Sequence, residues 1–119
     1  MKLMTQEIRK QIPALYAQEN EPDPTVFVKF FTPWSNWTWY ATEFDGEDIF
    51  FGYVEGLDNE LGYFSLSELE SLRGPAGLHI ERDIYFMPML LSHITGNKPQ
   101  RVEIESEFAD QQSSNEQQG

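Results

Sequence analysis

Cysteine is absent from this chain of 119 residues. That absence excludes disulfides, thiolate metal sites and thiol nucleophiles, and it suits a reducing cytosol. Long apolar runs are absent as well, since no stretch approaches the roughly 18 residues that a membrane span needs. The N-terminal stretch carries charges where a signal peptide would be continuously apolar. The sequence therefore predicts a cytoplasmic protein with no membrane partner.

Basic residues are scarce. The chain has eight Lys and Arg against twenty Asp and Glu, which gives a formal net charge of −12. A surface of this sign repels nucleic acid and anionic membranes and attracts basic protein surfaces. We therefore expect no direct binding of nucleic acid. Solubility alone would also account for an acidic surface, because net charge says little about function.

Residues typical of catalytic sites are few. His79 and His93 are the only histidines, and they show no metal-ligating pattern. The sequence contains no nucleophile elbow and no Gly-rich phosphate loop, and "EFDGED" lacks the ligand spacing of a calcium loop. Near Arg82, in "IERDIYF", an internal ion pair is expected rather than catalysis. We expect no catalytic residue, no metal, no cofactor and no enzymatic activity.

Aromatic residues, in contrast, are plentiful, with nine Phe, five Tyr and three Trp. Each can bury about 150–250 Å², so a chain of this length can build its own core. Runs rich in β-branched and aromatic residues predict strands at 25–31, 38–44, 49–55 and 61–64. Short turn sequences separate them, and "DGED" at 45–48 is typical of a tight hairpin. Successive short turns predict an antiparallel meander.

Helices are predicted on either side of this meander. Apolar spacing favours a short N-terminal helix over 5–12. At 65–73, Ser65 and Glu68 form a capping box, which is typical of a helix start. Leu72 is expected in the buried stripe of that second helix.

Beyond the second helix the pattern is weaker. Alternating apolar residues at 78–86 suit a strand, and Pro88 suits the first turn of a helix. Residues 98–119 are rich in Gln, Ser and Glu, and they predict a disordered acidic tail. We therefore expect one α+β domain over 1–97, an antiparallel meander of about four strands with an N-terminal helix and a second helix near residues 65–73.

Three tryptophans precede the acidic turn. On a strand, Trp37 and Trp39 share one face, and we expect both in the core. Trp34 lies in a turn, where an indole can stay partly exposed. Because Trp is enriched among binding hot spots, Trp34 is the predicted aromatic anchor of a binding surface.

Acidic residues gather in the meander without basic ones between them. From Lys29 to Arg73 the sequence has no intervening Lys, Arg or His. The candidates for an acidic binding surface are Glu43, Asp45, Glu47, Asp48, Asp58 and Glu60. Carboxylates two residues apart on a strand are about 6.6 Å apart, near the phosphate spacing along one strand of nucleic acid. A sheet edge lined in this way could imitate a duplex, whereas the same acids in separate turns would only face solvent.

The run "KFFTPWSNWTWYATEFDGEDIFFGYVEGLDNELGYFSLSELESLRG", followed by "IERDIYF", resembles a family of small single-domain bacterial proteins. These are proteins of unknown function carried on plasmids and integrative mobile elements. The resemblance covers about residues 5–90 and leaves out the tail. It implies no activity and no catalytic residues, but it implies a setting in which small accessory proteins act on host defences, often by binding.

Three functions stay open. The one we expect is a non-catalytic acidic binding protein of a mobile genetic element. It would dock on a basic protein that handles DNA or RNA, with DNA mimicry against a defence system as one form. The second is a carboxylate-based hydrolase or metal-dependent enzyme, which needs acids converging in a pocket. The third is a structural accessory module that forms homo-oligomers through exposed aromatic residues.

Overall fold

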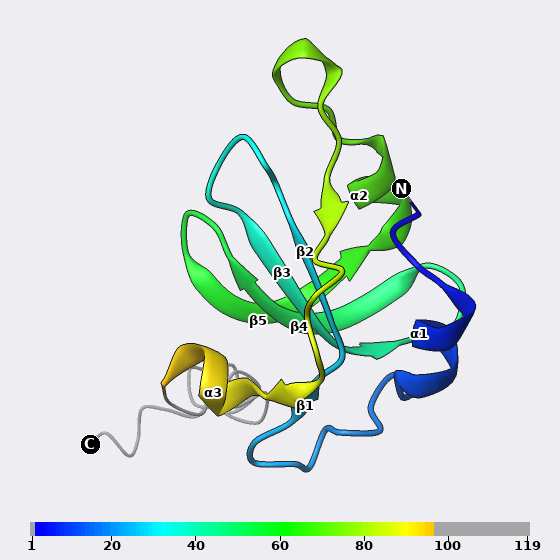
Figure 1. The fold of residues 1–119 in the computed structure, drawn as a ribbon. Coiled ribbons are helices and arrows are strands. Elements are labelled where there is room, and N and C mark those ends of the chain that lie inside the picture. The colour runs from blue at the N-terminus through cyan, green and yellow to red at the C-terminus, as the bar shows by residue number, and fades with distance from the viewer. Residues whose placement is uncertain (1, 97–119) are drawn as a thin grey trace, which may run out of the picture.

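Five antiparallel strands form the central sheet in our computed structural model of the chain, in the order β5-β4-β3-β2-β6 (Figure 1). The structure describes residues 2–96. The strands of this sheet are β2 (Val28–Phe31), β3 (Thr38–Phe44), β4 (Ile49–Glu55), β5 (Asn59–Ser65) and β6 (Glu81–Arg82). A second, two-stranded sheet pairs β1 (Thr25–Val26) with β7 (Met89–Leu90). The helices are α1 (Gln6–Gln11), α2 (Leu66–Ser71), α3 (Leu91–Thr95) and the 3₁₀ turn η1 (Pro75–Gly77).

The α+β class and the antiparallel meander are confirmed, but the expected count of four strands is wrong. The predicted strand 25–31 breaks at Phe27, so β1 leaves the central sheet and pairs with β7. The far edge of β2 then receives β6, with Phe30 opposite Arg82. These pairings join segments that are distant in the sequence, so no local pattern indicates them.

Both predicted helices are present. The hydroxyl oxygens of Thr5 and Ser65 each accept a backbone N–H, at 3.1 Å, from the residue three positions on. Past α2 the expectations are less accurate. The predicted strand at 78–86 is reduced to β6, and the helix expected from Pro88 begins at Leu91. Among residues 2–96, no helix has the length and apolar character that crossing a bilayer requires.

The larger core lies on the face of the sheet that α1 and α2 cover (Figure 1). Phe50 is fully buried at its centre. Its ring centroid lies 4.4 Å from that of Phe44, 5.2 Å from that of Phe64 and 5.4 Å from that of Phe30. Burying a side chain of this size stabilises the fold by roughly 1.5–3 kcal/mol.

Two side chains expected in this core lie at the surface. Trp37 is 38% exposed, whereas Trp39 is buried as predicted. Because β3 begins only at Thr38, Trp37 stands at the end of the sheet, where its ring stacks on Trp39 at 5.8 Å. Leu72 is exposed because α2 ends at Ser71, so Leu72 follows the last helical turn.

The opposite face of the sheet carries a smaller core. Val26 and Leu91 are fully buried there, and Tyr40 and Tyr53 belong to the same cluster. β1, β7 and α3 lie beneath one end of the sheet (Figure 1). Nearer the 32–37 turn, side chains on this face stay partly exposed. The predicted tail at 98–119 lies outside the described residues.

Candidate functional site

The acidic loops of the meander lie at opposite ends of the sheet. The 45–48 loop joins β3 to β4 beside α1, and the 56–58 loop joins β4 to β5 at the far end (Figure 1). β4 has seven residues, so about 24 Å separates the two loops at 3.4 Å per residue. The predicted acidic residues therefore do not form one continuous surface.

Glu43 is buried, so its predicted place on the acidic surface is wrong. Its side chain is only 1% exposed. A β-bulge between Ala41 and Glu43 changes the register and places Glu43 opposite Phe51. Its Oε1 accepts the Tyr16 N–H at 2.7 Å, and its Oε2 accepts the Gln18 N–H at 2.8 Å. Glu43 thus holds the segment before β1 against the sheet.

Asp45 and Asp48 organise the loop that contains them. Asp45 Oδ1 accepts the backbone N–H groups of Glu47, Asp48 and Ile49, at 2.8, 2.7 and 3.0 Å. These bonds, that of Asp48 first, hold the pKa of Asp45 below its ordinary value. The Asp48 carboxylate accepts the N–H and the hydroxyl of Ser67, at 2.8 and 3.1 Å. It thereby fastens the loop to α2.

Replacing Asp45 with Asn should make stability less dependent on pH. Because the folded pKa of Asp45 is lowered, its charge stabilises the fold above the unfolded value of 3.8, and this contribution is lost as the pH falls through the folded pKa. Urea unfolding should therefore separate D45N from the unsubstituted protein at pH 7 and less so near pH 3. Glu47→Gln, with the same charge change nearby, should show a smaller separation; equal separations would contradict this role.

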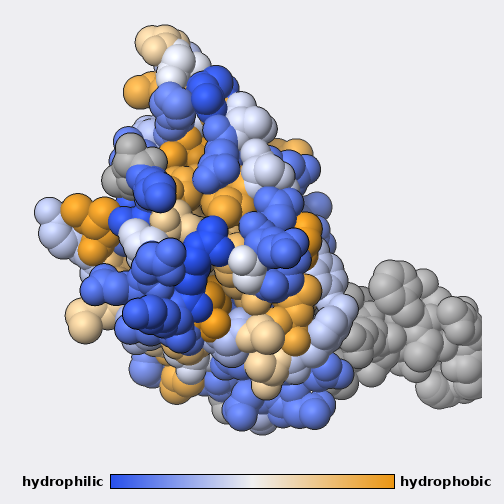
Figure 2. All heavy atoms as spheres, turned by 90° about the vertical axis from the view of Figure 1, so that its right-hand side faces the viewer, coloured by the Kyte–Doolittle hydropathy of each residue, from blue (hydrophilic) through white to orange (hydrophobic). Residues whose placement is uncertain are grey.

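Glu47, Asp58 and Glu60 face solvent, as does Asp45. Their carboxylates form no ion pair with residues 2–96. Figure 2 shows the right-hand side of Figure 1, which carries α1. Hydrophilic residues cover most of it, and apolar residues reach the surface between them.

Trp34 is partly exposed, but it does not protrude. Its indole packs against the larger core and lies directly on Gly74, where a Cβ would come within 2.2 Å of the ring. The aromatic side chains that do reach solvent near the 32–37 turn are Trp37 and, at 85% exposed, Tyr85.

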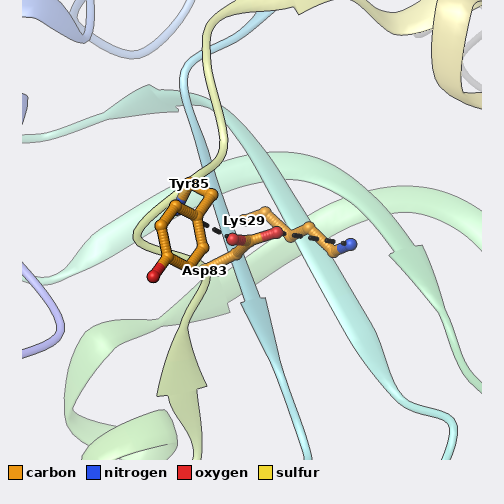
Figure 3. Close-up of polar contacts among 3 residues, drawn as sticks. All are labelled: Lys29, Asp83 and Tyr85. Carbon is orange, nitrogen blue, oxygen red and sulfur yellow. Dashed lines mark hydrogen bonds and ion pairs between the residues drawn. The ribbon is translucent and has the colours of Figure 1, made fainter.

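A groove of about 570 Å³ separates the 32–37 turn from the segment that follows β6. Residues on its walls include Lys29, Phe31, Trp37, Glu81, Asp83 and Tyr85. The Asp83 carboxylate organises it (Figure 3): Lys29 Nζ lies 3.7 Å from Oδ2, and the Tyr85 N–H donates to Oδ1 at 2.9 Å. The Lys29 ammonium also lies 5.8 Å from the centre of the Tyr40 ring.

The internal ion pair expected near Arg82 thus involves its neighbour, Asp83. The Arg82 side chain donates hydrogen bonds to the carbonyl oxygens of Lys2 and Leu3. It therefore fastens the N-terminal segment to the edge of the sheet.

Strand register shows which residues lie beside the groove on the same face of the sheet, because residues directly opposite one another share a face. The first row runs from Glu81 through Phe31 and Thr38 to Glu55. The second row runs from Asp83 through Lys29 and Tyr40 to Tyr53. Aromatic rings therefore lie between carboxylates at the two sides.

The pKa of Tyr40 reflects both burial and the negative charges on this face. Burial is the larger cause and raises the pKa of its hydroxyl to about 12, and the charges of Glu55, Tyr53 and Asp83 add to the increase, in that order. The pKa of Tyr53 is raised as well, by burial and then by Glu55. The Glu55 carboxylate therefore lies close enough to both tyrosine hydroxyls to oppose their ionisation.

Sequence analysis missed this groove as a candidate site. Tyr40 and Glu55 share a face only because of the bulge between Ala41 and Glu43, which no sequence pattern indicated. Nothing local in the sequence brings Asp83 beside Lys29. Within residues 2–96, no three His, Asp or Glu side chains are grouped so that they could hold a metal ion.

Comparison with known proteins gives one finding. The model of a family described as "Protein of unknown function (DUF2958)" matches residues 3–97. Neither the curated proteins nor the solved structures give a match.

Proposed function

The chain belongs to the DUF2958 family of proteins of unknown function, and from this premise we propose that it is a non-catalytic binding protein that docks on a basic protein surface. The observation that carries the proposal is a group of meander carboxylates without a Lys or Arg partner within residues 2–96: the exposed Glu47, Asp58 and Glu60 and the half-buried Glu55. With a net charge of −12, the chain attracts a basic partner at long range.

The partner that fits best is a DNA- or RNA-handling protein, since such proteins carry basic surfaces. The resemblance to proteins of mobile elements supports this choice. A duplex-like line of charge is not part of the proposal, because the acidic loops occupy opposite ends of the sheet. The end with the 32–37 and 56–58 loops suits docking better, since Gly56 in the second of these loops lies against the ring of the exposed Trp37.

Binding of the partner should weaken steeply with salt. Proteins captured from lysate on the immobilised chain would be identified, and the affinity of the most basic of them measured. We expect that affinity to fall at least tenfold between about 0.05 and 0.3 M salt, because exposed charges act through a screened field. A triple variant, Glu47→Gln with Asp58→Asn and Glu60→Gln, should bind more weakly at low salt.

Lys10→Gln provides the opposite control, because it removes an exposed positive charge. It should leave the affinity unchanged or raise it. An affinity that changes neither with salt nor with the triple substitution would contradict the proposed function.

A further inference from the structure

We infer that the groove beside Tyr85 accepts an arginine side chain of the basic partner, held by the Glu55 carboxylate and by the Tyr40 and Tyr53 hydroxyls. This inference rests on the proposed function and names what the docking surface recognises. Lysine would bind the same place less well, because only the planar guanidinium stacks on rings while donating several N–H bonds in fixed directions.

The chain itself already uses this chemistry at the other side of the groove. Lys29 Nζ lies between the Asp83 carboxylate, at 3.7 Å, and the Tyr40 ring, at 5.8 Å from its centre (Figure 3). A cation within about 6 Å of an aromatic ring is attracted by the negative face of the ring. The tyrosine pair therefore forms a surface on which a cation is stable.

The Glu55 side of the same surface has no such cation. Glu55 forms no ion pair within the described part of the chain, although strand register places it one strand from Thr38 and next to Tyr53 along β4. Lys29, which neutralises Asp83, lies two strands away from Glu55. A guanidinium bound at Glu55 would neutralise this carboxylate in the same way.

Two tyrosine hydroxyls add a second, independent indication. Tyr40 is 7% exposed and Tyr53 is 9% exposed, yet neither hydroxyl makes a hydrogen bond to any of residues 2–96. Both hydroxyl oxygens are therefore able to accept hydrogen bonds from a bound group. An arginine side chain at Glu55 would supply N–H donors to both oxygens.

The partner's side chain can reach this place from solvent. The groove opens beside Tyr85, which is 85% exposed and is held by the bond from its N–H to Asp83. Ile84, also exposed, continues the same wall. An arginine extending from a partner surface would pass along this wall, with its methylene groups against Phe31.

The test uses a fluorescein-labelled peptide of alternating arginine and glycine, with fluorescence anisotropy at low salt. Glu55→Gln should weaken binding about fivefold, the size expected for one partly exposed ion pair with an added ring contact. Lys29→Met should strengthen it about threefold, because it removes a like charge on the same face of the sheet while keeping the side-chain stem. A peptide with citrulline in place of arginine should not bind.

Glu70→Gln is the matched control, since it makes the same charge change at an exposed position on α2, outside the proposed docking acids, and should alter binding less than twofold. Tyr85→Ala, at an exposed position, should weaken binding without affecting folding. If Glu70→Gln weakens binding as much as Glu55→Gln, net charge alone attracts the peptide, and the groove inference is overturned while the proposed function stands. The same holds if the arginine peptide does not bind but a basic partner is still captured in a salt-dependent way.

Discussion

Alanine at position 52 is expected to destabilise the protein by about 3 kcal/mol or more, as overpacking against rigid atoms does. A Cβ on Gly52 would lie 1.9 Å from the Tyr40 carbonyl oxygen and 2.9 Å from the Ala41 Cα. Both atoms belong to the backbone of β3, so no side-chain rotation can relieve the clash. β3 and β4 would have to separate beside the bulge. Urea unfolding of Gly52→Ala measures the loss directly.

Gly62 provides the control for this experiment. It is the direct cross-strand partner of Gly52 on β5, and a Cβ there would meet no atom within 4 Å. Gly62→Ala should change stability by less than about 1 kcal/mol, and it could raise it by restricting the unfolded chain. Equal, small effects at the two positions would show that β3 and β4 do not approach as closely as described.

Replacing Glu43 with alanine should also cost about 3 kcal/mol, because it leaves buried backbone donors without their acceptor. The donors are the N–H groups of Tyr16 and Gln18, at 2.7 and 2.8 Å. Tyr16 has a φ of 73°, a conformation that costs energy in a residue other than glycine. The bond to Glu43 helps to hold that turn, so chemical denaturation should show the loss of stability.

Hydrogen exchange distinguishes this specific role from a general loss of stability. In Glu43→Ala the amide protons of Tyr16 and Gln18 should exchange faster than those at the centre of the sheet. Glu43→Gln keeps an acceptor and should lose less. Glu47→Ala, at an exposed position, should stay within about 0.5 kcal/mol of the unsubstituted protein. Unfolding curves for Glu43→Ala that match those of Glu47→Ala would refute the structural role.

The role of Glu43 also affects how the proposed function is tested. A set of substitutions chosen from the sequence alone would have included Glu43 among the binding acids. Any loss of binding in that set would then mix unfolding with lost charge. Glu47, Glu55, Asp58 and Glu60 are the positions where a carboxylate can be neutralised with little structural consequence.

Part of the candidate site was within reach of sequence analysis, since the alternation of β3 puts Thr38 and Tyr40 on one face. Which residues of β4 oppose them depends on the bulge between Ala41 and Glu43, which no sequence pattern indicated. The other wall was not within reach either. Asp83 meets Lys29 only because β6 joins β2, and Tyr85 reaches solvent because the chain leaves the sheet directly after β6.

Local chemistry was sufficient for the α+β class, the meander, the two helix starts and the acidic character. Caps, turn residues and alternation act over three to five residues, so they can be recognised in the sequence. Long-range packing settled the rest: one bulge turned Glu43 inward, and the end of β3 left Trp37 at the surface. The strand edge that β6 occupies also depended on it. The physical reason is that register and edge pairing depend on the summed free energy of contacts between distant segments, and inserting a single residue into a strand moves every later side chain to the other face.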